Sequence, residues 1–168
     1  MCIRDRSAVG PFVKIPEDFR KELDEFARFA IYSPQTAIMR GIAVDNRVIE
    51  PLGLTGSGLA AAFEHVLQQA DRKYVEKILK IIWQPGWANQ IQVTDFLKEV
   101  VPSHINTSGR LLYIRDRYMK GGRNLLSAFD ASEGTLYLTF VAALLAHEDT
   151  PNVLALDNVD GCLLYTSP

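Results

Sequence analysis

The sequence predicts a mixed α/β fold, and three stretches carry that prediction. Within residues 16–33, apolar side chains recur at steps of three and four, which indicates an amphipathic helix. The stretch NQIQVTD, residues 89–95, alternates apolar with polar side chains and indicates a strand. Near the C-terminus, an apolar helical stretch at 132–147 is followed by the continuous apolar run 153–156, as in a strand buried on both faces of a parallel sheet.

The first helix is expected to begin at Pro16-Glu17-Asp18 and to run to Ser33. It should end there because the residue before a proline avoids helical geometry, and Pro34 follows. One apolar stripe is expected along this helix, formed by Phe19, Leu23, Phe26 and Ala30.

The next part of the chain is expected to be mostly helical. A loop with a short extended piece, 41–53, leads into two successive helices at 56–69 and 72–83. Pro85-Gly86 is a strong turn signal and should end the second of them.

Two strands, 89–95 and 110–119, are expected between that turn and the apolar helix. A short helix is predicted at 96–101, and KGGRN, residues 120–124, is predicted to be a turn. Four aromatic residues on apolar faces are expected in the core rather than at a stacking surface: Trp83, Trp87, Tyr113 and Phe140.

Both ends of the chain are interpreted as translated adaptor DNA. CLLYTS can be encoded TGT CTC TTA TAC ACA TCT, and the reverse complement of that DNA contains ATG TGT ATA AGA GAC, which reads Met-Cys-Ile-Arg-Asp. One transposon-end sequencing adaptor, read on opposite strands, therefore accounts for residues 1–6 and 162–168. Such segments are excluded from fold reasoning. The native stretch is then expected to be 7–161, an internal part of a longer protein.

Composition limits the function classes. Without Arg4, Asp5 and Arg6, the 18 basic and 20 acidic residues become 16 and 19, a net charge of −3, so no basic excess indicates nucleic acid. Both cysteines lie in the adaptor segments, which favours a reducing, cytoplasmic setting. No run of roughly 18 apolar residues indicates a membrane span.

The segment GSGLAA, residues 56–61, fits the G-x-G-x-x-A dinucleotide fingerprint. That chemistry needs a preceding strand, which Pro51 interrupts, and an acidic residue after a following strand, where a helix is expected. A P-loop would need a lysine where Leu59 stands. The segment is therefore interpreted as a glycine-rich start of a packed helix.

Other candidate motifs are weaker. His65, His104 and His147 are far apart in sequence and have no carboxylate or cysteine at ligand spacing, so a metal site is not expected. Ser132 lacks the G-x-S-x-G context of a nucleophile elbow. A small basic cluster is interpreted as a solvated turn, although contact with phosphate or DNA remains an alternative: Arg115, Arg117, Lys120 and Arg123.

The informative region is 130–160. The apolar run 153–156 ends at Asp157, and ligands of open α/β sheets bind beyond the carboxyl ends of the strands. A carboxylate there is what a nucleotide hydrolase uses to hold Mg²⁺, although a plain buried strand ending in aspartate is common.

Asp130-Ala131-Ser132-Glu133 reads as the capping-box-like start of the apolar helix. Gly134 is costly in a first helical turn, by roughly 1 kcal/mol relative to alanine, and a closely approaching ligand would explain it. Free backbone N–H groups, the helix dipole and the hydroxyls of Ser132 and Thr135 would favour an anion.

The stretch Ala131-Ser132-Glu133-Gly134-Thr135 resembles the LSxG(T/Q) signature of ABC-type ATPase domains, and Val153–Asp157 looks like a Walker B strand. The resemblance is closest to soluble AAA-type predicted ATPases related to chromosome-maintenance and recombination ATPases. YSP, EPLGLTGSGLA, PGW and RDRYM also resemble members whose Walker B strand ends in DNVD or DNID. The resemblance covers most of 16–161 and is strongest over 130–160.

The resemblance implies a partial P-loop NTPase fold, an ABC-ATPase head without its Walker A portion. Its helical part would span about 16–125, and its signature helix and Walker B strand about 126–161. ATP and Mg²⁺ would be the cofactors of the full-length protein, and its partner would be a second head in a homodimer. Nucleic acid is possible but unsupported, and no membrane is implied.

The resemblance also implies roles for individual residues. The signature, Ser132, Glu133, Gly134 and Thr135, would reach the γ-phosphate of ATP held by a partner head, and Asp157 would hold Mg²⁺. The usual catalytic glutamate is replaced by Asn158, which cannot accept a proton. Asn158 would then orient water, with Asp160 as the nearest candidate base. Because of this substitution, a second interpretation is a non-catalytic relative that uses the signature surface only for protein association. A third interpretation is a simple α/β domain in which Asp157 is buried.

Overall fold

The computed structural model describes residues 16–43, 51–68, 73, 76–77, 80, 86–101 and 110–157. The predicted helix at 72–83 is helical at its described positions, 73, 76–77 and 80. The expected loop at 104–109, most of the loop at 41–53, and the side chains of Trp83 and His104 lie outside the described residues.

The fold is mixed α/β, as predicted, with one parallel and one antiparallel sheet among the described residues. The parallel sheet pairs β1 (Ala30–Tyr32) with β5 (Leu154–Leu156), and Ile31 faces Ala155 in the register. The antiparallel sheet has the order β2-β3-β4. Its strands are β2 (Ala88–Thr94), β3 (Leu111–Asp116) and β4 (Leu125–Ser127).

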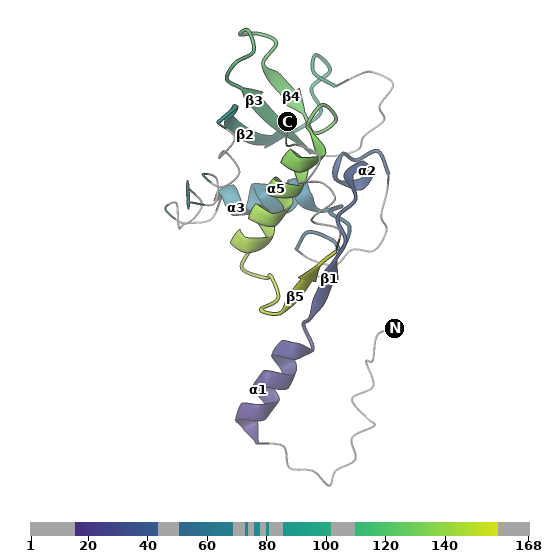
Figure 1. Cartoon of the computed structure of the whole chain (residues 1–168), viewed down its shortest axis with the longest axis vertical. Helices are drawn as coiled ribbons and strands as arrows, with labels where there is room; N and C mark the ends of the chain where they lie inside the picture. The colour runs from purple at the N-terminus through teal and green to yellow at the C-terminus, as the bar shows by residue number, and fades with distance from the viewer. Residues whose placement is uncertain are drawn as a thin grey trace, which may run out of the picture.

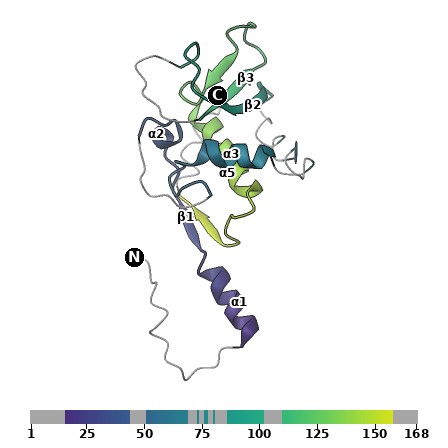
Figure 2. The same cartoon turned by 180° about the vertical axis from the view of Figure 1, so that it is seen from behind.

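Helices α3 (Leu59–Gln68) and α5 (Glu133–Ala146) lie between the two sheets (Figures 1 and 2). Helix α5 is apolar on nearly every side, and ten of its fourteen residues are buried. Such a helix must be surrounded on all sides to remove its surface from water. The main core therefore forms around it, and Phe140 at its centre packs edge-on against Tyr32 of β1.

The antiparallel sheet has two different faces. Ile91, Leu112 and Ile114 point into the main core. On the opposite face Tyr113 is fully buried under the segment that follows β2, and its hydroxyl accepts a hydrogen bond from the backbone N–H of Leu97. The predicted burial of Tyr113 and Phe140 is confirmed, and Trp87 is partly buried against the main core.

The prediction of one helix through 16–33 is wrong in its second half. Helix α1 (Glu17–Phe26) ends early, and Ala30–Tyr32 forms β1 instead. The short run Ala30-Ile31-Tyr32 gains a parallel partner in β5, and that non-local pairing overrides the local helical pattern. Figure 1 shows α1 projecting beyond the β1–β5 sheet.

Three smaller differences concern short elements. The segment 96–101 forms a hydrogen-bonded turn, with the N–H groups of Val100 and Val101 donating to Leu97, and no helix. Helix α2 (Thr36–Met39) and strand β4 were not predicted. Elements of three or four residues carry too little periodicity to be recognised in a sequence.

The glycine-rich segment starts a packed helix, as predicted. Gly56 has φ +90°, and a β-carbon there would lie 2.5 Å from the side chain of Met39. Gly58 lies so close to the backbone of Pro51 and Leu52 that a β-carbon would approach it to 3.1–3.2 Å. These glycines serve close packing at the start of α3.

Candidate functional site

The carboxylate predicted at the end of the parallel strand lies where the sequence places it. Asp157 follows β5 directly, and its backbone N–H donates to the carbonyl of Tyr32 at 2.8 Å. Its side chain is exposed, and the hydroxyl of Ser33 donates to its Oδ2 at 3.5 Å. The carboxylate therefore sits at the carboxyl ends of both parallel strands, the edge at which open α/β sheets bind ligands.

Ser132 is the N-cap of α5. Its backbone is extended, with φ −65° and ψ 153°, and its Oγ accepts a hydrogen bond from the N–H of Thr135 at 3.2 Å. The two hydroxyls of these residues also lie 2.9 Å apart. The predicted helix start is confirmed, and part of the donor capacity of the first turn is satisfied by Ser132 itself.

The first turn of α5 presents two different surfaces. Ser132 and Glu133 are exposed, whereas Gly134 and Thr135 are buried. Thr139 adds a further bond inside the helix, because its hydroxyl donates to the carbonyl of Thr135 at 2.7 Å. An approaching anion would therefore meet Ser132 and Glu133 before the other two signature residues.

Residues 33–36, which are the connection from β1 to α2 together with the first residue of α2, contact both predicted site elements. Its first residue, Ser33, contacts Asp157, and its last residue, Thr36, donates to Oε1 of Glu133 at 2.7 Å. Between them, the carbonyl of Pro34 accepts a hydrogen bond from the hydroxyl of Tyr137, one turn further along α5, at 2.5 Å. The start of α5 and the end of β5 thus lie on the same side of the molecule, joined by one short connection.

Arg40 adds a positive charge at the start of α5. Its Nη2 donates to the carbonyl of Ala131 at 2.7 Å, next to the N-cap. Its Nε is buried and has no hydrogen-bond partner in the described part of the chain. The guanidinium therefore holds the residue that precedes Ser132 and keeps a positive charge beside the positive end of the helix dipole.

Ser33, Thr36 and Arg40 are not among the predicted site residues, because the residues before Pro34 carry a helical pattern that hides β1. If β1 were recognised in the sequence, the polar residues directly after it would be candidate ligand-binding residues, because they lie at the carboxyl end of a parallel strand.

The donor set for a metal ion is small among the described residues. Asp157 and the hydroxyl of Ser33 are oxygen donors of the kind that Mg²⁺ prefers, and Mg²⁺ commonly uses one or two carboxylates together with phosphate oxygens and water. No group of three or more His, Cys, Asp or Glu side chains able to hold a metal occurs within the described ranges. Asn158 and Asp160, the predicted catalytic pair, lie outside them.

Two histidines that are distant in sequence meet in the structure. The rings of His65 and His147 stack with centroids 4.7 Å apart, at the C-terminal ends of α3 and α5. Nε2 of His65 lies 3.4 Å from Glu148, and Nδ1 of His147 accepts the N–H of Asp149 at 3.3 Å. This pair is remote from Asp157, because it lies at the opposite end of α5 from Ser132.

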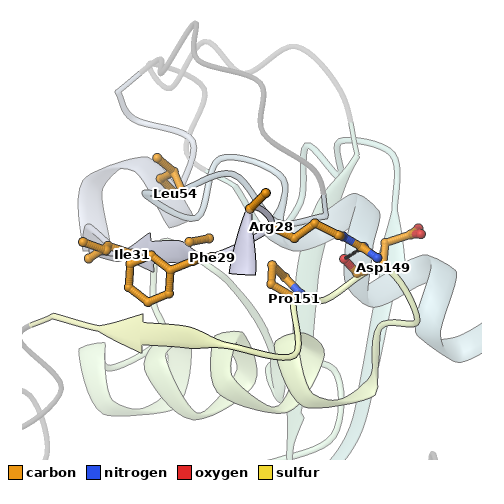
Figure 3. A pocket seen from close by; sticks show the side chains of 8 residues that line it. Arg28, Phe29, Ile31, Leu54, Asp149 and Pro151 are labelled. Carbon is orange, nitrogen blue, oxygen red and sulfur yellow. Dashed lines mark hydrogen bonds between the residues drawn. The ribbon is translucent and has the colours of Figure 1, made fainter. Parts of the chain in front are cut away.

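An opening of about 560 Å³ lies at the opposite end of the parallel sheet from Asp157. Phe29, Ile31, Leu54 and Pro151 line it, and Arg28 donates to the carbonyl of Asp149 at its rim (Figure 3). The segments before β1 and before β5 form its walls, so it lies toward the amino ends of these strands. That position differs from the carboxyl edge at which α/β sheets bind ligands.

No helix in the described part of the chain is both long and apolar enough to cross a membrane. No protein-family model matches the sequence, and neither a curated protein nor a solved structure matches it.

Proposed function

We propose that this chain is part of a soluble ATPase that binds and hydrolyses ATP with Mg²⁺ at an interface between two head domains. One observation supports the proposal above all others. The first turns of α5 and the carboxylate of Asp157 contact the same connection, residues 33–36, at the carboxyl end of a parallel pair of strands. A helix N-terminus and a carboxylate at that edge suit a nucleotide phosphate with its cation.

Each residue has a role in this proposal. Asp157 holds Mg²⁺, with the hydroxyl of Ser33 supporting its carboxylate. The exposed N-terminal end of α5, at Ser132, meets the γ-phosphate of ATP bound by the partner head. Asn158 orients the attacking water, and Asp160 accepts its proton, in a slow reaction that switches the association of the heads.

Arg40 is assigned a positioning role, because it holds the carbonyl of Ala131 rather than facing the reacting atoms. It fixes the backbone immediately before Ser132. Its charge also offsets that of Glu133, which would otherwise repel a phosphate at the start of α5.

A second function is supported by Asn158. An amide cannot act as a general base, so the same surface could serve only the association of two copies, without hydrolysis. Both functions require Ser132 at the interface. Only ATP hydrolysis requires Asp157, because this residue would bind Mg²⁺ and protein contact alone does not need the ion.

The proposal is tested in the protein extended by its upstream genomic DNA. We expect that DNA to encode G-x-x-x-x-G-K-[ST], and the extended protein to hydrolyse ATP with Mg²⁺. Asp157→Ala and Ser132→Arg should each remove activity. ATPase activity that both variants retain, or an upstream sequence without this motif, would reject the proposal.

Ser132→Asp is a sharper variant than Ser132→Arg, because aspartate is as good an N-cap as serine. It should preserve the stability of α5 while placing a negative charge against the phosphate. Loss of head association with unchanged stability would assign Ser132 a role at the interface. Loss of association in Ser132→Asp but not in Asp157→Ala would favour the non-hydrolysing alternative.

A further inference from the structure

The turn that joins β3 to β4, residues 117–123, carries three exposed cations. Arg117, Lys120 and Arg123 have no carboxylate within ion-pair distance among the described residues. Residues 115–124 contain four basic side chains and one acidic side chain, a net charge of +3 within a chain of net charge −2. A local excess of positive charge therefore lies at this turn, which we name the hairpin tip.

The single carboxylate nearby is already engaged by the backbone. Oδ1 of Asp116 accepts the N–H groups of Tyr118 at 2.7 Å and Met119 at 3.1 Å. It shapes the turn and does not pair with the cations of the hairpin tip. Because these cations have no carboxylate partner among the described residues, their charge remains available to an external anion.

The hairpin tip also presents an aromatic ring to solvent. Tyr118 is 77% exposed, and the guanidinium of Arg117 lies 5.8 Å from its ring centroid. Arg117 is anchored from the other side, since its Nη1 donates to the carbonyl of Gly86 at 2.9 Å. An exposed ring beside a fixed guanidinium is a surface on which a nucleic-acid base can stack.

Hydrogen-bonding side chains continue this surface onto the sheet. Arg115 donates to Gln90 at 3.1 Å and to Asn124 at 3.2 Å, and Gln90 donates to Gln92 at 3.4 Å. The far end of the same face is covered, because Leu111 and Tyr113 pack beneath the segment 96–101. The uncovered, amide-rich end therefore adjoins the hairpin tip.

We propose that the hairpin tip and the adjoining end of the sheet bind single-stranded nucleic acid. Phosphates would contact Arg117, Lys120 and Arg123, and a base would stack on Tyr118. The combination of cations, an exposed aromatic ring and side-chain amides suits a nucleic acid better than an acidic peptide, which offers no bases to stack. A lipid surface would require a larger apolar patch. This proposal does not depend on the ATPase proposal, because the residues of the two surfaces differ.

The first test measures fluorescence anisotropy of labelled oligothymidylate with the 168-residue chain at low salt. We expect Lys120→Gln/Arg123→Gln to weaken binding at least tenfold and to lower the slope of log affinity against log salt by roughly 1.4, about 0.7 for each lost phosphate contact. Arg20→Gln/Lys21→Gln removes the same charge from the exposed surface of α1 and should leave both quantities unchanged. Absence of binding by the wild-type chain, or equal loss in both double variants, would overturn the proposal.

A second comparison separates stacking from charge. Tyr118→Ala should weaken binding about fivefold or more without changing the salt slope, whereas Tyr118→Phe should retain binding. Equal binding to polyglutamate or to anionic phosphatidylserine vesicles would show a general polyanion surface and would overturn the assignment to nucleic acid. All these side chains are exposed, so circular dichroism should show an unchanged fold in each variant.

Discussion

Helix α5 is apolar on nearly every side and α1 carries one apolar stripe, yet the two helices have opposite surroundings. Ten of the fourteen residues of α5 are buried. The apolar stripe of α1 is largely exposed, with 52% of Phe19, 43% of Leu23 and 64% of Phe26 accessible to solvent. Figure 1 shows the same contrast, with α5 between two sheets and α1 projecting from one end.

The difference shows what a periodic pattern can and cannot establish. A stripe at three- and four-residue steps identifies which side of a helix is apolar. Burial additionally requires an opposing surface, and helix stability in proteins comes mainly from such packing. The stability of the described fold should therefore depend strongly on α5 and weakly on α1.

The largest expected effect tests this contrast directly. Phe140→Ala removes a fully buried ring from the centre of the core and should lower the free energy of unfolding by about 3–5 kcal/mol. Phe26→Ala removes the same ring from α1 and should change it by less than about 0.5 kcal/mol. Urea denaturation measures both. A comparable loss in Phe26→Ala would mean that α1 is packed in solution and would break the comparison.

The next effect concerns the attachment of α5 to the connection that carries the proposed site. Tyr137→Phe removes the hydroxyl that donates to the carbonyl of Pro34 and leaves this buried acceptor without that bond. We expect a loss of about 1–2 kcal/mol in urea denaturation. Thr36→Val, which removes the exposed contact to Glu133, is the matched comparison and should cost less. A larger loss in Thr36→Val than in Tyr137→Phe would show that the exposed contact between Thr36 and Glu133, and not the buried bond from Tyr137 to Pro34, holds the connection.

A smaller effect is expected at the start of α5. Ser132→Ala removes the N-cap acceptor and should cost about 1 kcal/mol, while Ser132→Asp should cost little, because both serine and aspartate cap helices well. Thermal unfolding followed by circular dichroism can measure both. If alanine is tolerated as well as aspartate, the cap seen in the structure does not stabilise α5.

The smallest effect is expected where the parallel sheet meets α5. Burial raises the pKa of the Tyr32 phenol above its ordinary value of 10.0, and its hydroxyl has no hydrogen-bond partner within the described ranges. Above pH 10 the Tyr32 phenol therefore loses its proton more readily in the unfolded chain than in the folded chain. This difference should lower the free energy of unfolding as the pH rises beyond 10. Near neutral pH, Tyr32→Phe should leave the free energy of unfolding unchanged or raise it by under about 1 kcal/mol. The same variant should also make the fall of the free energy of unfolding at alkaline pH less steep. An unchanged alkaline decline in this variant, measured by urea denaturation across pH, would contradict the assignment.

Much of the second half of the fold could be predicted from local patterns. The apolar helix at 132–147 appears as α5, with Ser132 as its N-cap and His147 as its C-cap. Strand β5 follows it as expected, and the alternating stretch at 89–95 forms β2. These elements succeed because their own side chains define both their period and their ends.

The two missed strands share one cause. Strand β1 was assigned to a helix, and β4 was missed, because each is three residues long and is defined by pairing with a strand distant in sequence. The stacked pair His65 and His147 was missed for the same reason, since their contact depends on how α3 packs against α5.

The sequence by itself determined the apolar helix, its serine cap and the aspartate that ends the last strand, because hydrophobic period and capping chemistry are local properties. Only the tertiary structure decided that Asp157 and Glu133 both contact the connection 33–36, that Arg40 holds the residue before Ser132, and that α1 stays exposed. Those outcomes depend on the parallel pairing of β1 with β5 across more than one hundred residues, and local patterns carry no information about such pairing.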